Sequence, residues 1–176
     1  THTLFLARAV GSEGRVLSVE PQRKLFRELV ANVELNGAKG NVIPLRYALG
    51  EKGRIAAMNP TVRGNEGHTS LGKGGDAVEV RTLDSFALRN LSLLKIDVEG
   101  FEQQVLKGAA ATIARERPAI AVEIEGGLDL DTAPRQRQRR GWATLAMLDA
   151  LGYVVRRVGV HDYLALLRRG GLALAY

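Results

Sequence analysis

The chain has 176 residues and no cysteine, which excludes disulfides, thiolate chemistry and cysteine-ligated zinc. Hydrophobic residues make up 45% and charged residues 25%, a composition typical of a globular protein rather than a disordered one, and no apolar run approaches the roughly 18 residues of a membrane span. The net charge of +6 favours anionic ligands but leaves the fold open. We therefore expect one domain, residues 1–176, that acts in the reducing cytoplasm and makes no contact with a membrane.

The first part of the chain predicts alternating helices and strands. Residues 1–10 (THTLFLARAV) read as a helix that is already under way. A short run rich in valine and leucine predicts a buried strand at 15–21, and apolar residues at steps of three and four predict an amphipathic helix from about Gln22 to Asn36. Residues 41–50 predict another strand, and Pro44 favours an edge position because it has no N–H to donate.

The second part continues this alternation and ends in two paired strands. The link GVHD between the last two strands is too short for a parallel crossover, so we expect them to be antiparallel neighbours. Trp142 and Tyr153 are expected in the core, and residues 128–140 are expected to be irregular. The predicted elements are strands at 54–58 and 77–81, a buried strand before Asp97, a helix from about Phe101 to Arg115, a strand at 118–127, a helix from Trp142 to Leu151, and strands at 153–158 and 163–169.

Strands that alternate with helices predict an α/β fold with a mostly parallel sheet covered on both faces. Here the sheet would end in a C-terminal antiparallel hairpin. Open parallel sheets bind ligands beyond the carboxyl ends of their strands. Glu20, Asp97 and Glu123 all lie at such ends in the predicted elements. The pattern therefore predicts an acidic ligand site at this edge.

The stretch LLKIDVEGFEQQVLKGA, residues 93–109, allows two interpretations of its first two acidic residues. Asp97 is a possible N-cap of the following helix, and Glu99 would favour the positive end of the helix dipole. Alternatively, both carboxylates face a bound ligand. Gly100 favours the second interpretation, because glycine permits a close approach to the backbone.

Several other residues allow two interpretations, one as part of a functional site and one as ordinary surface residues. Glu20 could accept hydrogen bonds from ribose hydroxyls, as acidic residues at this place do in nucleotide-binding α/β folds, or it could simply face solvent. His68 could be a general base or a solvated loop residue. The arginine-rich run at 135–140 could contact phosphates, although no aromatic residues are interleaved for base stacking. Asp97 and Glu99 alone are too few ligands to predict a metal site.

Several segments together resemble the FkbM-type S-adenosylmethionine-dependent methyltransferases. They are GRVLSVEP, ANVELNG, NVIPLRYALGEKG, VRTLDS, LLKIDVEGFEQQVLKGA and RPAIAVEIEG, in that order, and the closing LGYVVRRV and DYLAL. The resemblance covers nearly the whole chain and implies a Rossmann-like class I methyltransferase fold, with strand seven antiparallel between strands five and six. It also implies S-adenosylmethionine as cofactor and a hydroxyl acceptor on a sugar, lipid or secondary metabolite.

The resemblance assigns roles to particular residues. Glu20 matches the acid that binds the cofactor ribose. Asp97 and Glu99 match the acidic pair near the methyl group and the acceptor, where one of them could act as the catalytic base, and Asp97 could instead hold the positive end of the cofactor. No metal is implied. The other residues expected around the cofactor are Thr3, Pro21, Ala48, Asn65, Thr69 and Ser70.

The chain departs from the family at its start. A first strand and a glycine-rich turn of the form D-x-G-A-N-x-G should directly precede Thr1, so we expect the chain to be N-terminally truncated. Two other functions stay open at this point. The arginines favour a nucleic-acid methyltransferase, but the Asn-Pro-Pro-aromatic signature is missing, and we expect no nucleic-acid partner. A truncated chain could also be a non-catalytic binding module.

Overall fold

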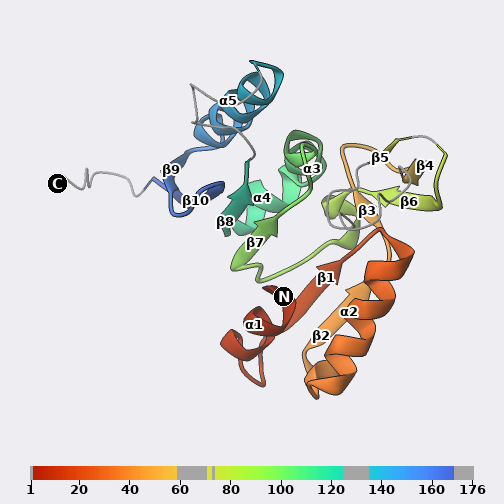
Figure 1. The fold of residues 1–176 in the computed structure, drawn as a ribbon. Coiled ribbons are helices and arrows are strands. Elements are labelled where there is room, and N and C mark those ends of the chain that lie inside the picture. The colour runs from red at the N-terminus through yellow and green to blue at the C-terminus, as the bar shows by residue number, and fades with distance from the viewer. Residues whose placement is uncertain (1, 59–70, 73, 125–134, 169–176) are drawn as a thin grey trace. The chain divides into compact units, whose positions relative to one another are not determined.

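The computed structural model describes residues 2–58, 71–72, 74–124 and 135–168 (Figure 1). These residues form two compact units, Thr1–Arg81 and Thr82–Tyr176. Among the helices in these ranges, none is both long enough and apolar enough to cross a membrane. The expectation of a single domain stays a prediction.

The first unit contains the predicted N-terminal helix, α1, and the amphipathic helix, α2. Gly37 follows α2 with a φ of +65°, the left-handed conformation expected of glycine after a helix. Strand β1 pairs in parallel with β2, so that Val16 lies opposite Val42. The elements are α1 His2–Ala9, β1 Val16–Val19, α2 Arg23–Leu35, the 3₁₀ turn η1 Ala38–Gly40, β2 Val42–Leu45, β3 Ala48–Leu49, β4 Arg54–Met58, β5 Leu71–Gly72 and β6 Ala77–Arg81.

The strand predicted at 41–50 is two strands, so this prediction was wrong. Strand β2 pairs with β1, whereas β3 pairs in parallel with β6 in a different sheet of order β3-β6-β4-β5. The break at residues 46–47 lets the chain leave one sheet and enter the other. Pro44 lies in β2, which has β1 as its only partner among the described strands, consistent with its missing N–H.

Alternating side chains of β6 build part of the core of the first unit. Val78 and Val80 are buried and pack with Ala48 and Met58, as the alternation at 77–81 predicted. A second group of buried residues joins α1, β1, α2 and β2. Its members are Ala7, Val16, Val33 and Val42.

The second unit has a four-stranded sheet of order β7-β8-β10-β9. Strands β7 and β8 are parallel, and β10 is antiparallel to both β8 and β9. The last strand therefore lies between its two predecessors, as the family resemblance implied. The elements are the 3₁₀ turn η2 Leu83–Phe86, β7 Leu93–Ile96, α3 Glu102–Gly108, α4 Ala110–Glu116, β8 Ala119–Glu123, α5 Arg135–Ala150, β9 Tyr153–Arg157 and β10 Asp162–Leu167.

The helix predicted from Phe101 to Arg115 is divided at Ala109 into α3 and α4. Asp84 of η2 explains the new start. Its carboxylate accepts hydrogen bonds from the backbone N–H groups of Ala111 at 3.1 Å and Thr112 at 2.7 Å. These N–H groups lie in the first turn of α4 and have no partner within the helix, so the carboxylate stabilises a helix that begins here.

Helix α5 begins at Arg135, earlier than predicted, and includes the basic run that was expected to be irregular. Its buried residues are Gly141, Thr144 and Leu148, which lie on one helical stripe. Trp142 lies beside this stripe and is 46% exposed, so its prediction as a core residue was wrong. Tyr153 is buried, as predicted, and its hydroxyl donates a hydrogen bond to the Pro118 carbonyl at 2.8 Å.

Candidate active site

Acidic residues gather at one edge of the sheet in the second unit. Asp97 directly follows β7, Glu123 ends β8, and Asp162 begins β10. Because β7 and β8 are parallel and β10 runs the other way, these three positions meet at the same edge. Asp162 and Glu123 are opposite each other in the register of β10 and β8. Two like charges in such a pair are destabilising unless a cation lies between them.

The cation is the ammonium group of Lys95 in β7. Its Nζ lies 3.9 Å from Asp97 Oδ2, 3.9 Å from Glu123 Oε2 and 3.7 Å from Asp162 Oδ1. The side chain is only 17% exposed, and Nζ is buried with no hydrogen-bond partner among the described residues. We call these four residues the Lys95 cluster. Its three carboxylates outnumber its single cation, so the cluster favours a further positive charge.

The carboxyl group of Glu123 is the most perturbed acid of the cluster. Burial raises its pKa, and so do the charges of Asp97 and Asp162 and a hydrogen bond with Asp97, whereas Lys95 lowers it. The net effect is a raised pKa. Glu123 is thus close enough to Asp97 for a hydrogen bond, and the Lys95 ammonium opposes the protonation of Glu123.

Replacing Glu123 with glutamine should change how stability depends on pH. Because its folded pKa is raised, Glu123 contributes stability that is present below its unfolded pKa and is lost as the pH rises through the folded value. Glu123→Gln cannot ionise, so the variant should lose less stability than the wild type as the pH rises above about 4, the ordinary pKa of a glutamate. Thermal unfolding across this range measures the difference. A steeper loss in the variant would contradict the raised pKa.

A strained turn follows Asp97. The Phe101 N–H donates to the Val98 carbonyl at 3.2 Å, and the two central residues, Glu99 and Gly100, have φ values of +49° and +86°. Positive φ at both positions is the signature of a type I′ turn. Glu99 is not a glycine, so its backbone conformation costs free energy, and such strain often marks functional sites.

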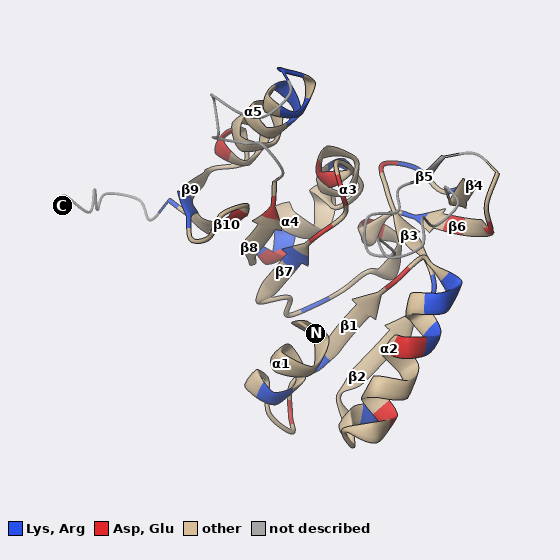
Figure 2. Ribbon diagram, viewed as in Figure 1, with Lys and Arg blue, Asp and Glu red and all other residues tan. Residues whose placement is uncertain are grey.

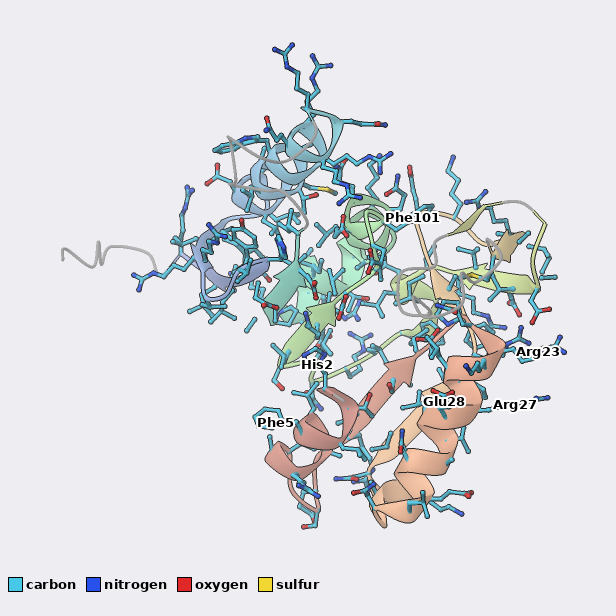
Figure 3. The ribbon with its side chains drawn as sticks, in the orientation of Figure 1. His2, Phe5, Arg23, Arg27, Glu28 and Phe101 are labelled. Atoms are coloured by element: carbon cyan, nitrogen blue, oxygen red, sulfur yellow. The ribbon has the colours of Figure 1, made fainter. Side chains whose placement is uncertain are left out.

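Glu102 holds this turn in place. It is 5% exposed, and its Oε1 accepts a hydrogen bond from the Gly100 N–H at 2.7 Å. Helix α3 begins at Glu102, and Phe101, labelled in Figure 3, occupies the N-cap position without a capping hydrogen bond from its side chain. The interpretation of Asp97 as the N-cap was therefore wrong. Asp97 and Glu99 lie in the segment between β7 and α3, which Figure 2 shows as an acidic connection.

Gly100 permits the close approach that the sequence suggested. A Cβ atom at this position would lie 3.2 Å from Arg140 Nη1, tighter than most real Cβ contacts. Arg140 belongs to α5, and its carbonyl accepts a hydrogen bond from Gln103 Nε2 of α3 at 3.2 Å. The guanidinium group of Arg140 thus lies against the turn that follows Asp97.

In the first unit, Glu20 directly follows β1, and its N–H donates to the Leu45 carbonyl at 3.0 Å. Its Oε1 accepts a hydrogen bond from the N–H of Gln22 at 2.8 Å, across Pro21. This bond fixes the carboxylate at the start of α2.

The remaining predicted cofactor residues have different surroundings. Thr3 Oγ1 and Ser18 Oγ are 2.8 Å apart and form a hydrogen bond. Ala48 is buried in the core of the first unit, so any ligand contact would have to use its main chain. Asn65, Thr69 and Ser70, and also His68, lie outside the described residues. Within the described ranges, no group of three or more histidine, cysteine or acidic side chains is arranged to hold a metal ion.

Sequence reasoning missed two members of the Lys95 cluster. Lys95 lies between the buried residues Leu94 and Ile96 and was not singled out. Asp162 was part of the predicted hairpin link. The alternation along β7 could have shown that Lys95 faces away from the buried side chains of Leu94 and Ile96. It could not have shown the partners of Lys95, because Glu123 and Asp162 belong to two other strands.

Comparison with known proteins assigns the family. The sequence model of one protein family, the methyltransferase FkbM domain, matches residues 1–155 of this chain. The chain is similar to hexuronic acid methyltransferase AglP of Haloferax volcanii, with 29% identity over 123 residues, covering 67% of this chain and 50% of AglP. It is also similar to the crystal structure of methyltransferase FkbM from Methylobacillus flagellatus, with a TM-score of 0.62 and 19% identity, covering 92% of this chain and 40% of that one.

The chain thus spans 50% of the length of AglP and 40% of the length of the chain in the FkbM crystal structure. The structural likeness shows a Rossmann-like methyltransferase fold, in agreement with the fold class expected from the sequence. The family model covers most of the residues, including the segments that carry Glu20, the Lys95 cluster up to Glu123, and the Gly100 turn. On this match, the chain belongs to the methyltransferase FkbM domain family.

Proposed function

We propose that this protein is an S-adenosylmethionine-dependent methyltransferase that methylates a hydroxyl group of a sugar-containing acceptor. The Lys95 cluster is the observation that carries the proposal. It places a carboxylate, Asp97, at the carboxyl end of strand β7, beside a buried ammonium. The name of AglP supports a sugar acceptor, since that relative acts on hexuronic acid.

The residues present fit the cofactor in two respects. Glu20 offers a carboxylate held at the carboxyl end of β1, where acidic residues of nucleotide-binding α/β folds accept hydrogen bonds from ribose hydroxyls. The net negative charge of the Lys95 cluster suits a cationic group. When bound, S-adenosylmethionine supplies an electrophilic methyl group on a positively charged sulfur.

The acceptor needs alignment and a base. Asp97 accepts the proton of the acceptor hydroxyl, which requires a distance of about 2.6–3.2 Å between the two oxygens. Lys95 holds the carboxylate of Asp97 in place by its positive charge, since its Nζ lies 3.9 Å from Asp97 Oδ2. The hydrogen bond from the Gly100 N–H to Glu102 Oε1 holds the turn after Asp97, which supports the alignment.

Glu20 should contribute strongly to cofactor affinity. Glu20→Ala removes charge-assisted hydrogen bonds and should weaken S-adenosylmethionine binding by about 1.5–3 kcal/mol. Glu28 is a matched control, since it is an exposed glutamate on α2 (Figure 3), and Glu28→Ala should bind normally. Isothermal titration calorimetry on the protein in its full natural length measures both. Equal affinities for the two variants would remove Glu20 from the site.

A methyl-transfer assay tests the proposed function itself. The full-length protein is incubated with methyl-labelled S-adenosylmethionine and a set of neutral and acidic sugars, and labelled products are separated and treated with alkali. We expect labelled product that resists alkali, because a methyl ether is stable and a methyl ester is hydrolysed. Label only in alkali-sensitive product would show that a carboxyl group, not a hydroxyl group, is the acceptor. Absence of labelled sugar would contradict the proposal.

A further inference from the structure

Helix α5 begins with a cluster of arginines at the end where cations are least favoured. Four of its first six residues are arginine, and its first turn contains no acidic residue. The helix dipole places partial positive charge at this end, so arginine side chains here are repelled by the dipole and by one another. Figure 2 shows this basic end of α5. Charges placed where they destabilise a helix often mark a functional site, such as one that binds a ligand. The four residues are Arg135, Arg137, Arg139 and Arg140.

Arg140 is the member of this group that reaches the candidate active site. Its Nη1 lies 3.2 Å from the position of a Cβ on Gly100, in the turn that follows Asp97. Its main chain is fixed by hydrogen bonds from Gln103 at 3.2 Å and from Thr144 Oγ1 at 3.0 Å. The residue is exposed, and within the described residues its guanidinium group forms no hydrogen bond or ion pair.

Chain geometry limits the distance between Arg140 and the proposed base. Asp97 and Gly100 are three residues apart, so their Cα atoms are separated by at most about 10 Å, and the turn shortens this distance. One sugar residue with a charged substituent can therefore contact both groups. The carboxylates of the Lys95 cluster already share the Lys95 ammonium, and none of the ion pairs found for them involves Arg140.

Charge decides what kind of acceptor suits this arrangement. The Lys95 cluster is net negative and repels an anionic acceptor, unless a second cation binds the anionic group. A guanidinium group binds carboxylate and phosphate with two parallel hydrogen bonds. Resting on the proposed function, we infer that Arg140 is an acceptor-binding residue and that the acceptor is a sugar that carries an anionic group, either carboxylate or phosphate.

The test compares three probes with the full-length protein: glucuronate, glucose 6-phosphate and glucose. Affinity is measured by calorimetry in the presence of S-adenosylhomocysteine, and KM and kcat are measured for any probe that is methylated. At least one anion should bind about tenfold or more tightly than glucose. The stronger of the two anions identifies carboxylate or phosphate as the recognised group.

Arg140→Gln should remove this preference and raise KM for the anionic probe about 10- to 100-fold, with little change in kcat. Arg139→Gln, at the preceding residue of the helix, is the matched control and should keep the preference for the anionic probe. Arg140→Lys should retain part of the preference for the anionic probe, because lysine keeps the positive charge but cannot form two parallel hydrogen bonds. The inference is overturned by equal binding of all three probes, or by a preference that survives Arg140→Gln. Normal S-adenosylmethionine binding and methyl transfer alongside such a result would leave the proposed function intact.

Discussion

Asp97→Asn should lower turnover by about a hundredfold or more while the melting temperature stays near that of the wild type. Asparagine has the same shape, but it cannot take the proton of an acceptor hydroxyl. The structure gives little reason for a loss of stability, since Asp97 does not cap α3, which begins at Glu102. The substitution also removes one of three carboxylates that repel one another around Lys95. Turnover is measured as labelled product under saturating cofactor, and unfolding by circular dichroism.

Asp149→Asn is the control for this experiment. Asp149 is an exposed aspartate on α5 that pairs with Arg168, so its substitution should leave turnover unchanged. A native melting curve together with undiminished turnover in Asp97→Asn would show that Asp97 is not the base. Glu99→Gln would then be the next variant to measure, since Glu99 occupies the strained turn two residues later.

Lys95→Met should lower both stability and turnover. Methionine keeps most of the apolar stem of lysine and removes the ammonium, so three carboxylates are left without their shared cation. Removal of one partner from a fully buried pair costs about 3–5 kcal/mol. The carboxylates here are 36–52% exposed, so water screens part of their repulsion and we expect a loss of about 1–3 kcal/mol. Chemical denaturation at neutral pH measures it.

The pH profile separates an electrostatic role of Lys95 from a packing role. Lys95 lowers the pKa of Glu123, so without the ammonium this pKa rises further and Glu123, which forms a hydrogen bond with Asp97, keeps its proton to higher pH. The acid limb of the turnover profile should therefore move to higher pH in Lys95→Met, and turnover should recover as the pH is raised. Lys95→Arg keeps the charge and should keep the limb near its normal position. An unmoved limb in Lys95→Met would leave Lys95 with a structural role only.

Much of the fold could be predicted because hydrophobic periodicity follows the elements closely. The alternation of Val78 and Val80 predicted strand β6, and the short link GVHD predicted the antiparallel pair β9 and β10. The errors arose where periodicity does not report on tertiary contacts. The helical pattern continues through Ala109, although Asp84 starts a new helix there. The first turns of α5 are rich in arginine and glutamine, which form helices well but lack an apolar stripe to reveal one.

The candidate site could be predicted only in part. Asp97 and Glu123 were recognisable because each closes a predicted strand, and ligand sites lie at such ends. Lys95 could not be recognised, because its role depends on the register that places Asp162 opposite Glu123. Arg140 depends on the packing of α5 near α3, which no local pattern encodes. Contacts between distant segments are a property of the folded chain, so the sequence indicated Asp97 and Glu123 but did not show that Lys95 and Asp162 join them.

Strand β10 lies between β8 and β9 although it follows both of them in the chain. During synthesis, β8 therefore leaves the ribosome with one edge open, and this edge stays open until residues 162–167 have emerged. An open edge can pair with a strand of another nascent chain. Asp162 arrives with the strand that closes this edge, so the charge cluster is completed in the same event. We therefore expect pauses in translation shortly before β10 to favour misassembly by strand addition.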